Sequence, residues 1–226
     1  MKTLTLSGWG QPSDALANIA PGAAVFDYSA YADTGQATQA LRAFVDAEHV
    51  IGWSLGGQLA LHAIAAGALQ PRRLTLIGVP FQFVKNDVVV QAMDRFTFDT
   101  FRNNYATAPE RTATRFHSLL AKGDREARAV MQGLSNHPEI ANATRWLPWL
   151  DVLDHQPLSM LAMDAAPATT IIHGSQDAIV PVAQAHMLAA ALPGARVDIW
   201  EGAAHAPHLH DGARLQAAMQ QQRSAA

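Results

Sequence analysis

Apolar residues in this chain occur in short runs that alternate with longer segments of helical spacing. Runs typical of strands lie at 2–7, 23–27, 49–53, 73–78, 168–173 and 196–200. Segments with helical spacing follow most of them, at 12–20, 38–47, 55–67, 182–192 and 212–222. Because strands and helices alternate, we expect an α/β fold with a six-stranded, mainly parallel sheet and right-handed crossovers.

The alternation stops between residues 79 and 166. No strand-like run stands out there, and helical spacing covers about 88–103, 109–121, 124–134 and 138–153. Such an insertion is long enough to form a helical cap. We therefore expect a single compact domain, in which residues 1–78 and 167–226 form the core and residues 79–166 form the cap.

The sequence Gly-Trp-Ser-Leu-Gly at residues 52–56 joins a predicted strand directly to a predicted helix. This arrangement is typical of a nucleophile elbow, a tight turn that presents a serine at the end of a sheet. Glycine two residues before and after Ser54 removes Cβ atoms that would clash as strand and helix approach each other. Ser54 is therefore a candidate nucleophile.

A carboxylate and a histidine follow the last two predicted strands. Asp177 lies in the loop after strand 168–173, and His205 lies in the loop after strand 196–200. Ligands bind beyond the carboxyl ends of strands in an open parallel sheet, so these loops are where chemistry is expected. The chain order serine, aspartate, histidine is the order of the hydrolase fold. Asp151 and Asp154 are alternative acids.

Each candidate has a role that its chemistry supports. A serine hydroxyl needs a base within hydrogen-bond reach, and His205 is able to take its proton and return it to the leaving group. Asp177 would fix the tautomer of His205. The oxyanion needs two donors, for which we expect the backbone N–H of Leu55 and that of Trp9, which lies in the loop after the first strand.

Composition narrows the classes of protein. Cysteine is absent, which excludes disulfides and thiolate ligands, and the net charge of −3 argues against general nucleic-acid binding. No apolar run is long enough to span a bilayer, and the chain begins without a secretory signal, so we expect a cytoplasmic protein without membrane contacts. His205, His208 and His210 suggest a metal site only weakly, and we expect neither metal nor cofactor.

Charge is distributed unevenly. The segment from Arg95 to Arg128 contains seven basic and four acidic residues, a local charge of +3. Six of the eight phenylalanines lie in or beside the expected cap, residues 79–166. A solvated helix face and ordinary packing explain part of both patterns; a docking surface and an apolar channel are the alternatives.

Four motifs together resemble the α/β-hydrolase superfamily, and more closely the BioH group of pimeloyl-[acyl-carrier protein] methyl ester esterases. They are Gly-Trp-Gly at 8–10, Gly-Trp-Ser-Leu-Gly-Gly at 52–57, Gly174 with Asp177 and Val180-Pro181, and Ala-Ala-His-Ala-Pro at 203–207. The resemblance implies a cofactor-independent serine carboxylesterase of biotin synthesis, with Ser54, Asp177 and His205 as its triad. It is weak between residues 79 and 166.

The resemblance also suggests binding residues. Arg111 and Arg115 match the segment with which these esterases meet the acidic acyl-carrier protein, and Arg128 falls near a further basic position. Trp53 and Phe116 are expected in the acyl pocket. The chain departs from the family in having serine rather than histidine before Gly8, and the first hairpin of the common fold has no counterpart.

Other functions stay open at this point. The same triad would serve a thioesterase, a lactonase or a general short-chain esterase. A non-catalytic receptor with this fold is a further alternative. A phosphate-binding turn is disfavoured, because no G-x-x-x-x-G-K-[ST] motif is present.

Overall fold

The computed structural model describes residues 2–134, 138–161 and 166–224, and its centre is one six-stranded sheet. The strands are β1 (Thr3–Leu6), β2 (Ala24–Val25), β3 (His49–Trp53), β4 (Arg73–Ile77), β5 (Ala168–Gly174) and β6 (Arg196–Trp200). They lie in the order β2-β1-β3-β4-β5-β6, and each neighbouring pair is parallel. The predicted α/β sheet is confirmed. Its winding order reverses between β1 and β3, where ligands bind in such sheets.

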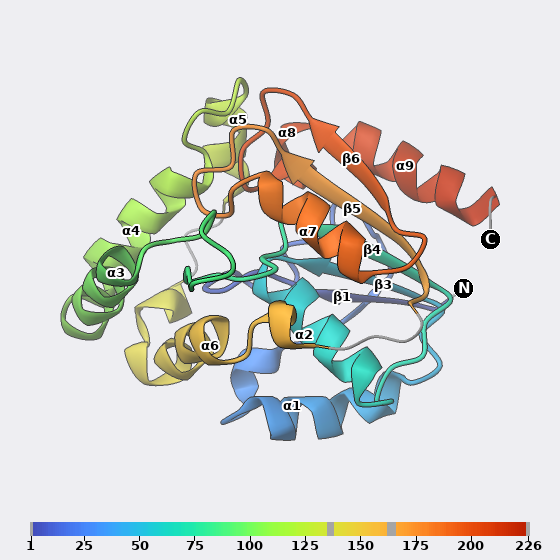
Figure 1. Cartoon of the computed structure of the whole chain (residues 1–226), viewed down its shortest axis with the longest axis horizontal. Helices are drawn as coiled ribbons and strands as arrows, with labels where there is room; N and C mark the ends of the chain where they lie inside the picture. The colour runs from blue at the N-terminus through green and yellow to red at the C-terminus, as the bar shows by residue number, and fades with distance from the viewer. Residues whose placement is uncertain (1, 135–137, 162–165, 225–226) are drawn as a thin grey trace.

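Helices cover both faces of the sheet (Figure 1). They include α1 (Thr34–Leu41), α2 (Leu55–Ala65), α7 (Ala183–Ala191) and α9 (Gly212–Ser224). Successive side chains of a strand point to opposite faces. Gly52 of β3 faces α2, whereas its neighbour Ile51 lines a small cavity together with Met219 of α9. The central strands are therefore buried on both sides, which explains their continuous apolar runs.

A second group of helices lies between β4 and β5 in sequence. It consists of α3 (Arg95–Thr107), α4 (Pro109–Leu120), α5 (Ala127–Gly133) and α6 (Ala143–His155), with short 3₁₀ turns at Pro138–Ala141 and Leu158–Met160. Figure 1 shows these helices gathered beyond the carboxyl ends of the strands. None of the helices in the described part of the chain is both long and apolar enough to cross a membrane.

Several predicted elements differ from the structure. Residues 12–20 form successive turns instead of a helix: most of their backbone hydrogen bonds join residues three apart, as in Ala15 N–H to Pro12 C=O, whereas the bond from Ala20 N–H to Leu16 C=O joins residues four apart. Residues 88–94 are not helical either, and α3 begins only after Asp94, which caps it. The four-residue helix α8 (Pro207–His210) was not predicted.

Three backbone segments meet tightly where α2 begins. A Cβ on Gly56 would lie 2.3 Å from the carbonyl oxygen of Leu6, and one on Gly52 would lie 2.4 Å from Cα of Gly57. Both distances are far below van der Waals contact, and the opposing atoms are backbone that does not rotate away. Glycine at these positions therefore lets β1, β3 and α2 converge.

We expect Gly56→Ala to lower the free energy of unfolding by about 1–3 kcal/mol or more, because the added methyl overlaps backbone atoms. Urea unfolding followed by circular dichroism measures this. Gly212→Ala is the matched control, since its Cβ would meet Ile19 at 3.7 Å, an ordinary contact. Equal stabilities for the two variants would contradict the close approach.

A buried histidine packs against the end of β3. The ring of His208 lies edge-on to Trp53 with 4.4 Å between centroids, and neither ring nitrogen has a hydrogen-bond partner among the residues that the structure describes. Burial, and secondarily charge on His205, lower the pKa of His208 to about 3. His208 is therefore neutral in the folded protein at every pH above that value.

This burial predicts a loss of stability in acid. In the unfolded chain His208 takes up a proton below pH 6.5 or so, whereas the folded protein does not until about pH 3. The contribution of His208 therefore falls by roughly 1.4 kcal/mol per pH unit across that window. We expect His208→Phe to reduce this slope in urea unfolding at pH 4–7, and the exposed His186→Gln to leave it unchanged. Parallel slopes for His208→Phe and the parent would contradict this.

Candidate active site

Ser54 occupies the strained turn between β3 and α2. Its φ of 52° and ψ of −122° make it the one non-glycine residue with positive φ in the described ranges. Such a conformation costs about 1–3 kcal/mol and persists only where the surroundings impose it. The converging glycines described above provide that constraint. Ser54 therefore lies in the sharp turn between the end of β3 and the start of α2, the position that a nucleophile elbow gives to its serine.

The acid and the base meet as a buried pair. Oδ2 of Asp177 and Nδ1 of His205 are 2.7 Å apart, and both side chains are almost fully inaccessible. The alternative acids are bound elsewhere, Asp151 by Arg102 and Asp154 by Arg95. The pairing occupies Nδ1 of His205 and leaves its Nε2 outside this contact.

Asp177 is surrounded by donors. Oδ1 accepts the N–H groups of Ile179 and Val180, each at 2.8 Å, and Oδ2 accepts from His205 and, at 3.3 Å, from His173. Burial by itself would raise the pKa of Asp177, but the two histidines hold it well below its usual range. The acid is therefore ionised wherever the protein is folded at ordinary pH, and it favours a proton on Nδ1 of His205.

Sequence reasoning missed His173. Its Nε2 lies 2.8 Å from the carbonyl of Val180 and 3.3 Å from Asp177. Both neighbours are acceptors, so Nε2 carries the proton, and the buried Nδ1 has no hydrogen-bond partner within the described part of the chain. Burial opposes protonation of His173, yet Asp177 and the Val180 carbonyl raise its pKa overall. The spacing of four residues between His173 and Asp177 is the sequence signal for this contact.

Ser54 and His205 are tied to the same piece of backbone. The N–H of Ser54 donates to the carbonyl of Ile77 at 2.8 Å, and a Cβ on the next residue, Gly78, would lie 3.3 Å from Nδ1 of His205. On the other side, Nε1 of Trp53 donates to the backbone carbonyl of His205 at 3.0 Å. Gly78 and Trp53 therefore both hold the histidine loop close to the turn that carries Ser54.

The predicted oxyanion donors lie in the turns after β1 and β3. A Cβ on Gly8 would be 3.5 Å from Cβ of Ser54, so the turn that carries Trp9 lies beside Ser54. Among the described residues, the backbone N–H groups of Trp9 and Leu55 take part in no hydrogen bond. The indole of Trp9 is fixed, because its Nε1 donates to the carbonyl of Trp146 at 2.9 Å.

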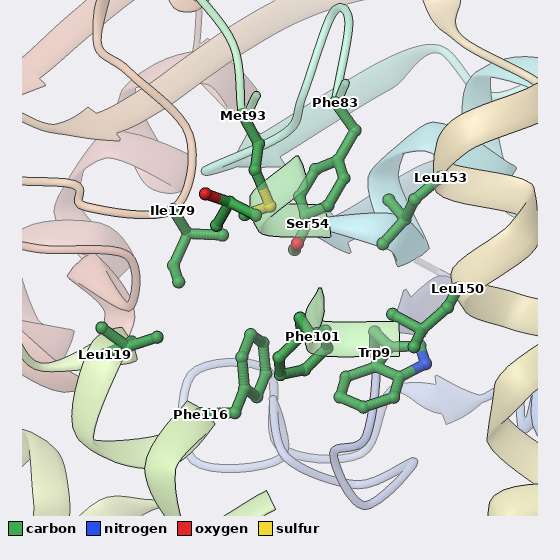
Figure 2. A pocket seen from close by; sticks show the side chains of 11 residues that line it. Trp9, Ser54, Phe83, Met93, Phe101, Phe116, Leu119, Leu150, Leu153 and Ile179 are labelled. Carbon is green, nitrogen blue, oxygen red and sulfur yellow. The ribbon is translucent and has the colours of Figure 1, made fainter. Parts of the chain in front are cut away.

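An apolar pocket opens beside Ser54. The side chains that line it are Trp9, Ser54, Phe83, Met93, Thr97, Phe101, Phe116, Leu119, Leu150, Leu153 and Ile179. Figure 2 shows Ser54 on one side of the cavity, with the rings of Trp9, Phe101 and Phe116 across from it. No charged side chain belongs to this lining. The pocket therefore fits an uncharged alkyl group.

The two residues predicted for the acyl pocket have different places. Phe116 lines the pocket, whereas Trp53 is not among the lining residues. The indole of Trp53 is buried and packs against the histidine loop, where its Nε1 donates to the carbonyl of His205. Of the six phenylalanines in or beside the cap segment, Phe83, Phe101 and Phe116 line the pocket, and Phe96 is 80% exposed.

The basic residues of the segment 95–128 fall into two groups. Arg95 and Arg102 form ion pairs with carboxylates of α6. Arg111 and Arg115 on α4 and Arg128 on α5 are exposed, and none of the ion pairs found among described residues includes them. The local positive charge at the surface therefore comes from α4, α5 and the turn between them.

The histidines near the site do not gather as metal ligands. His208 packs on Trp53, and Nδ1 of His210 pairs with Asp124 at 2.6 Å. Across the described ranges no three His, Cys, Asp or Glu side chains are arranged to hold a metal ion.

Comparison with known sequences agrees with this geometry. The profile of the alpha/beta hydrolase family matches residues 3–218. The chain is 35% identical over 174 residues to the biotin biosynthesis bifunctional protein BioHC of Teredinibacter turnerae, a match that covers 71% of this chain and 30% of that protein. It is 30% identical to the pimeloyl-[acyl-carrier protein] methyl ester esterase of Xylella fastidiosa, over 75% of this chain and 68% of that one. It is 32% identical to the pimeloyl-[acyl-carrier protein] methyl ester esterase of Aromatoleum aromaticum, over 71% of this chain and 67% of that one.

Solved structures share the fold at low sequence identity. An esterase from Exiguobacterium antarcticum superposes with a TM-score of 0.81 at 15% identity, covering 98% of this chain and 91% of that one. A bromoperoxidase from Bacillus anthracis gives 0.79 at 17% identity, covering 99% and 92%. The predicted α/β-hydrolase fold and hydrolase class are confirmed. With a family match over nearly its whole length, the chain belongs to the alpha/beta hydrolase family and is related within it to the pimeloyl-[acyl-carrier protein] methyl ester esterases.

Proposed function

We propose that this protein is a serine carboxylesterase that cleaves the methyl ester of a pimeloyl group carried by acyl-carrier protein. The observation that carries the proposal is the buried pair of Asp177 and His205, which packs against Gly78, next to the Ile77 carbonyl that binds the N–H of the strained Ser54 at the wall of an apolar pocket. The names of the relatives at 30–35% identity support the choice of substrate.

The reaction follows from the roles of these groups. Ser54 Oγ attacks the ester carbonyl while its proton passes to Nε2 of His205, and the negative oxygen that forms is stabilised by the N–H groups of Trp9 and Leu55. His205 then protonates the departing methoxide, which leaves as methanol. Water attacks the acyl-enzyme, with His205 again as base, and releases the ω-carboxylate and Ser54. Asp177 stabilises the imidazolium in both steps.

The pocket favours a neutral ester over a charged end group. Because its lining holds no charged side chain, a carboxylate there would lose its hydration without compensation. A methyl ester enters at no such cost, and the carboxylate product is driven out. The pocket thus suits the uncharged ω-end of a carried acyl chain.

We further propose that residues 79–166 act as a cap which receives the carrier protein. Residues 135–137 and 162–165 of this segment lie outside the described part of the chain. The exposed Arg111, Arg115 and Arg128 would meet an acidic carrier on α4 and α5, while Phe116 of α4 reaches the pocket. Attraction between opposite charges would raise the rate of encounter.

We expect the protein to release methanol, and not the carrier thiol, from the carrier-bound pimeloyl methyl ester. Ser54→Ala should abolish this and the hydrolysis of a short p-nitrophenyl ester, a loss of at least about 10³-fold, with unchanged circular dichroism. Ser118→Ala, on the exposed face of α4, is the matched control. Release of the carrier thiol with the methyl ester retained would indicate a thioesterase. Turnover by Ser54→Ala, or failure of a fluorophosphonate to label Ser54, would show that the proposed function is wrong.

We expect Arg111→Glu combined with Arg115→Glu to lower kcat/KM for the carrier-linked ester by about 10-fold or more at low salt and to spare p-nitrophenyl esters, because only the carrier meets this surface. The difference should shrink as salt rises. Arg42→Glu with Arg72→Glu, exposed and remote from α4, is the charge-matched control. An equal loss on both substrates, or the same loss in the control, would refute docking on α4.

A further inference from the structure

The loop that carries His205 is bound along its length by the turn between α4 and α5. The N–H of His205 donates to the carbonyl of Leu120 at 3.2 Å, and the N–H of Arg125 donates to the carbonyl of Gly202 at 2.8 Å. The turn 120–126 thus runs beside the histidine loop and is hydrogen-bonded to it at His205 and at Gly202.

A buried carboxylate occupies the centre of this contact. Oδ2 of Asp124 accepts the N–H of Ala204 at 2.7 Å, and Oδ1 accepts from Nδ1 of His210 at 2.6 Å and from the N–H of Glu126 at 2.8 Å. The Asp124 side chain has no exposed surface. Three donors satisfy the buried carboxylate, which therefore joins the residue before His205 to the last residue of α8.

Close packing on either side leaves the turn little freedom. A Cβ on Gly133 at the end of α5 would lie 2.9 Å from Cδ2 of Leu209 on α8, and one on Gly123 would lie 3.3 Å from Cβ of Gln176. Figure 1 shows α5 beside α8. The segment 120–133 accordingly packs against the loops of both Asp177 and His205.

We propose that Asp124 and His210 are positioning residues that hold His205 in line with Ser54, an inference that rests on the proposed function of His205 as general base. Neither residue lines the pocket or contacts Asp177, so neither meets substrate. Their effect passes through the backbone of Ala204 and through α8. Because a displacement of about 1 Å at a reacting group lowers turnover by roughly 10²-fold, loss of this contact acts on kcat rather than on KM.

Asp124→Asn keeps the size of the side chain but places an NH₂ group against one of its N–H donors. We expect kcat on a p-nitrophenyl ester to fall by about 10–100-fold, with KM within about twofold of the parent. His210→Ala should lower kcat in the same way, and His210→Gln, whose amide is able to donate to Asp124, should restore most of it. Asp151→Asn is the matched control: it removes a carboxylate of α6 that pairs with Arg102, far from the histidine loop.

Proton NMR gives a readout that is independent of turnover. The Nδ1 proton of His205, bonded to Asp177, should give a far-downfield resonance that broadens in Asp124→Asn and His210→Ala and stays sharp in Asp151→Asn. Asp177 and His205 themselves are unchanged in all three variants.

The outcomes separate this inference from the proposed function. If the parent hydrolyses esters and both Asp124→Asn and His210→Ala keep its kcat and its downfield resonance, the positioning role is wrong. An equal fall in Asp151→Asn also overturns it. If Asp124→Asn does not fold, the pair His210→Ala and His210→Gln decides by the same criteria. If the parent itself is inactive, the proposed function fails, and the NMR comparison still tests whether Asp124 orders His205.

Discussion

The close approach of β1, β3 and α2 is the constraint on which the rest of the site depends. Without side chains at Gly52 and Gly56, the helix begins immediately after the strand, and Ser54 alone absorbs the change of direction at positive φ. The strain at Ser54 is maintained because the atoms in contact are backbone atoms, which cannot rotate away as side chains do. The turn after β1, with Gly8 and Trp9, is brought beside Ser54 by the same convergence.

Parallel winding then supplies the other groups. The loops after β5 and β6 begin at the same edge of the sheet as the turn that carries Ser54. Ile77 and Gly78, at the end of β4, lie between that turn and the loop after β5. Asp177 and His205 therefore meet although 28 residues separate them in the chain. The helices between β4 and β5 contribute the apolar wall, including Phe101 and Phe116.

The sheet was predictable from the sequence because it depends on local signals, and signals of the same kind single out Ser54, Asp177 and His205, whose catalytic roles stay predictions. Buried parallel strands are continuous apolar runs, and a serine flanked by glycines between a strand and a helix is typical of a nucleophile elbow. Features set by contacts between distant segments were not predictable in this way. Residues 12–20 have helical spacing but form turns. Trp53 is an aromatic residue of the kind expected in an apolar pocket, but its indole binds the histidine loop. Nothing in the sequence pairs Asp124 with Ala204, because the contact depends on how the helical segment packs.

The bond between Asp124 and the histidine loop has a consequence for how such enzymes diversify. An insertion that only covered the pocket would be exchangeable as a module, with new specificity acquired by replacing it whole. Here a chimera joined at the ends of β4 and β5 would separate Asp124 from Ala204 and His210, and the borrowed segment would have to bring a substitute anchor. Substitutions at the pocket wall leave these bonds of Asp124 in place, whereas exchange of the entire insertion removes them.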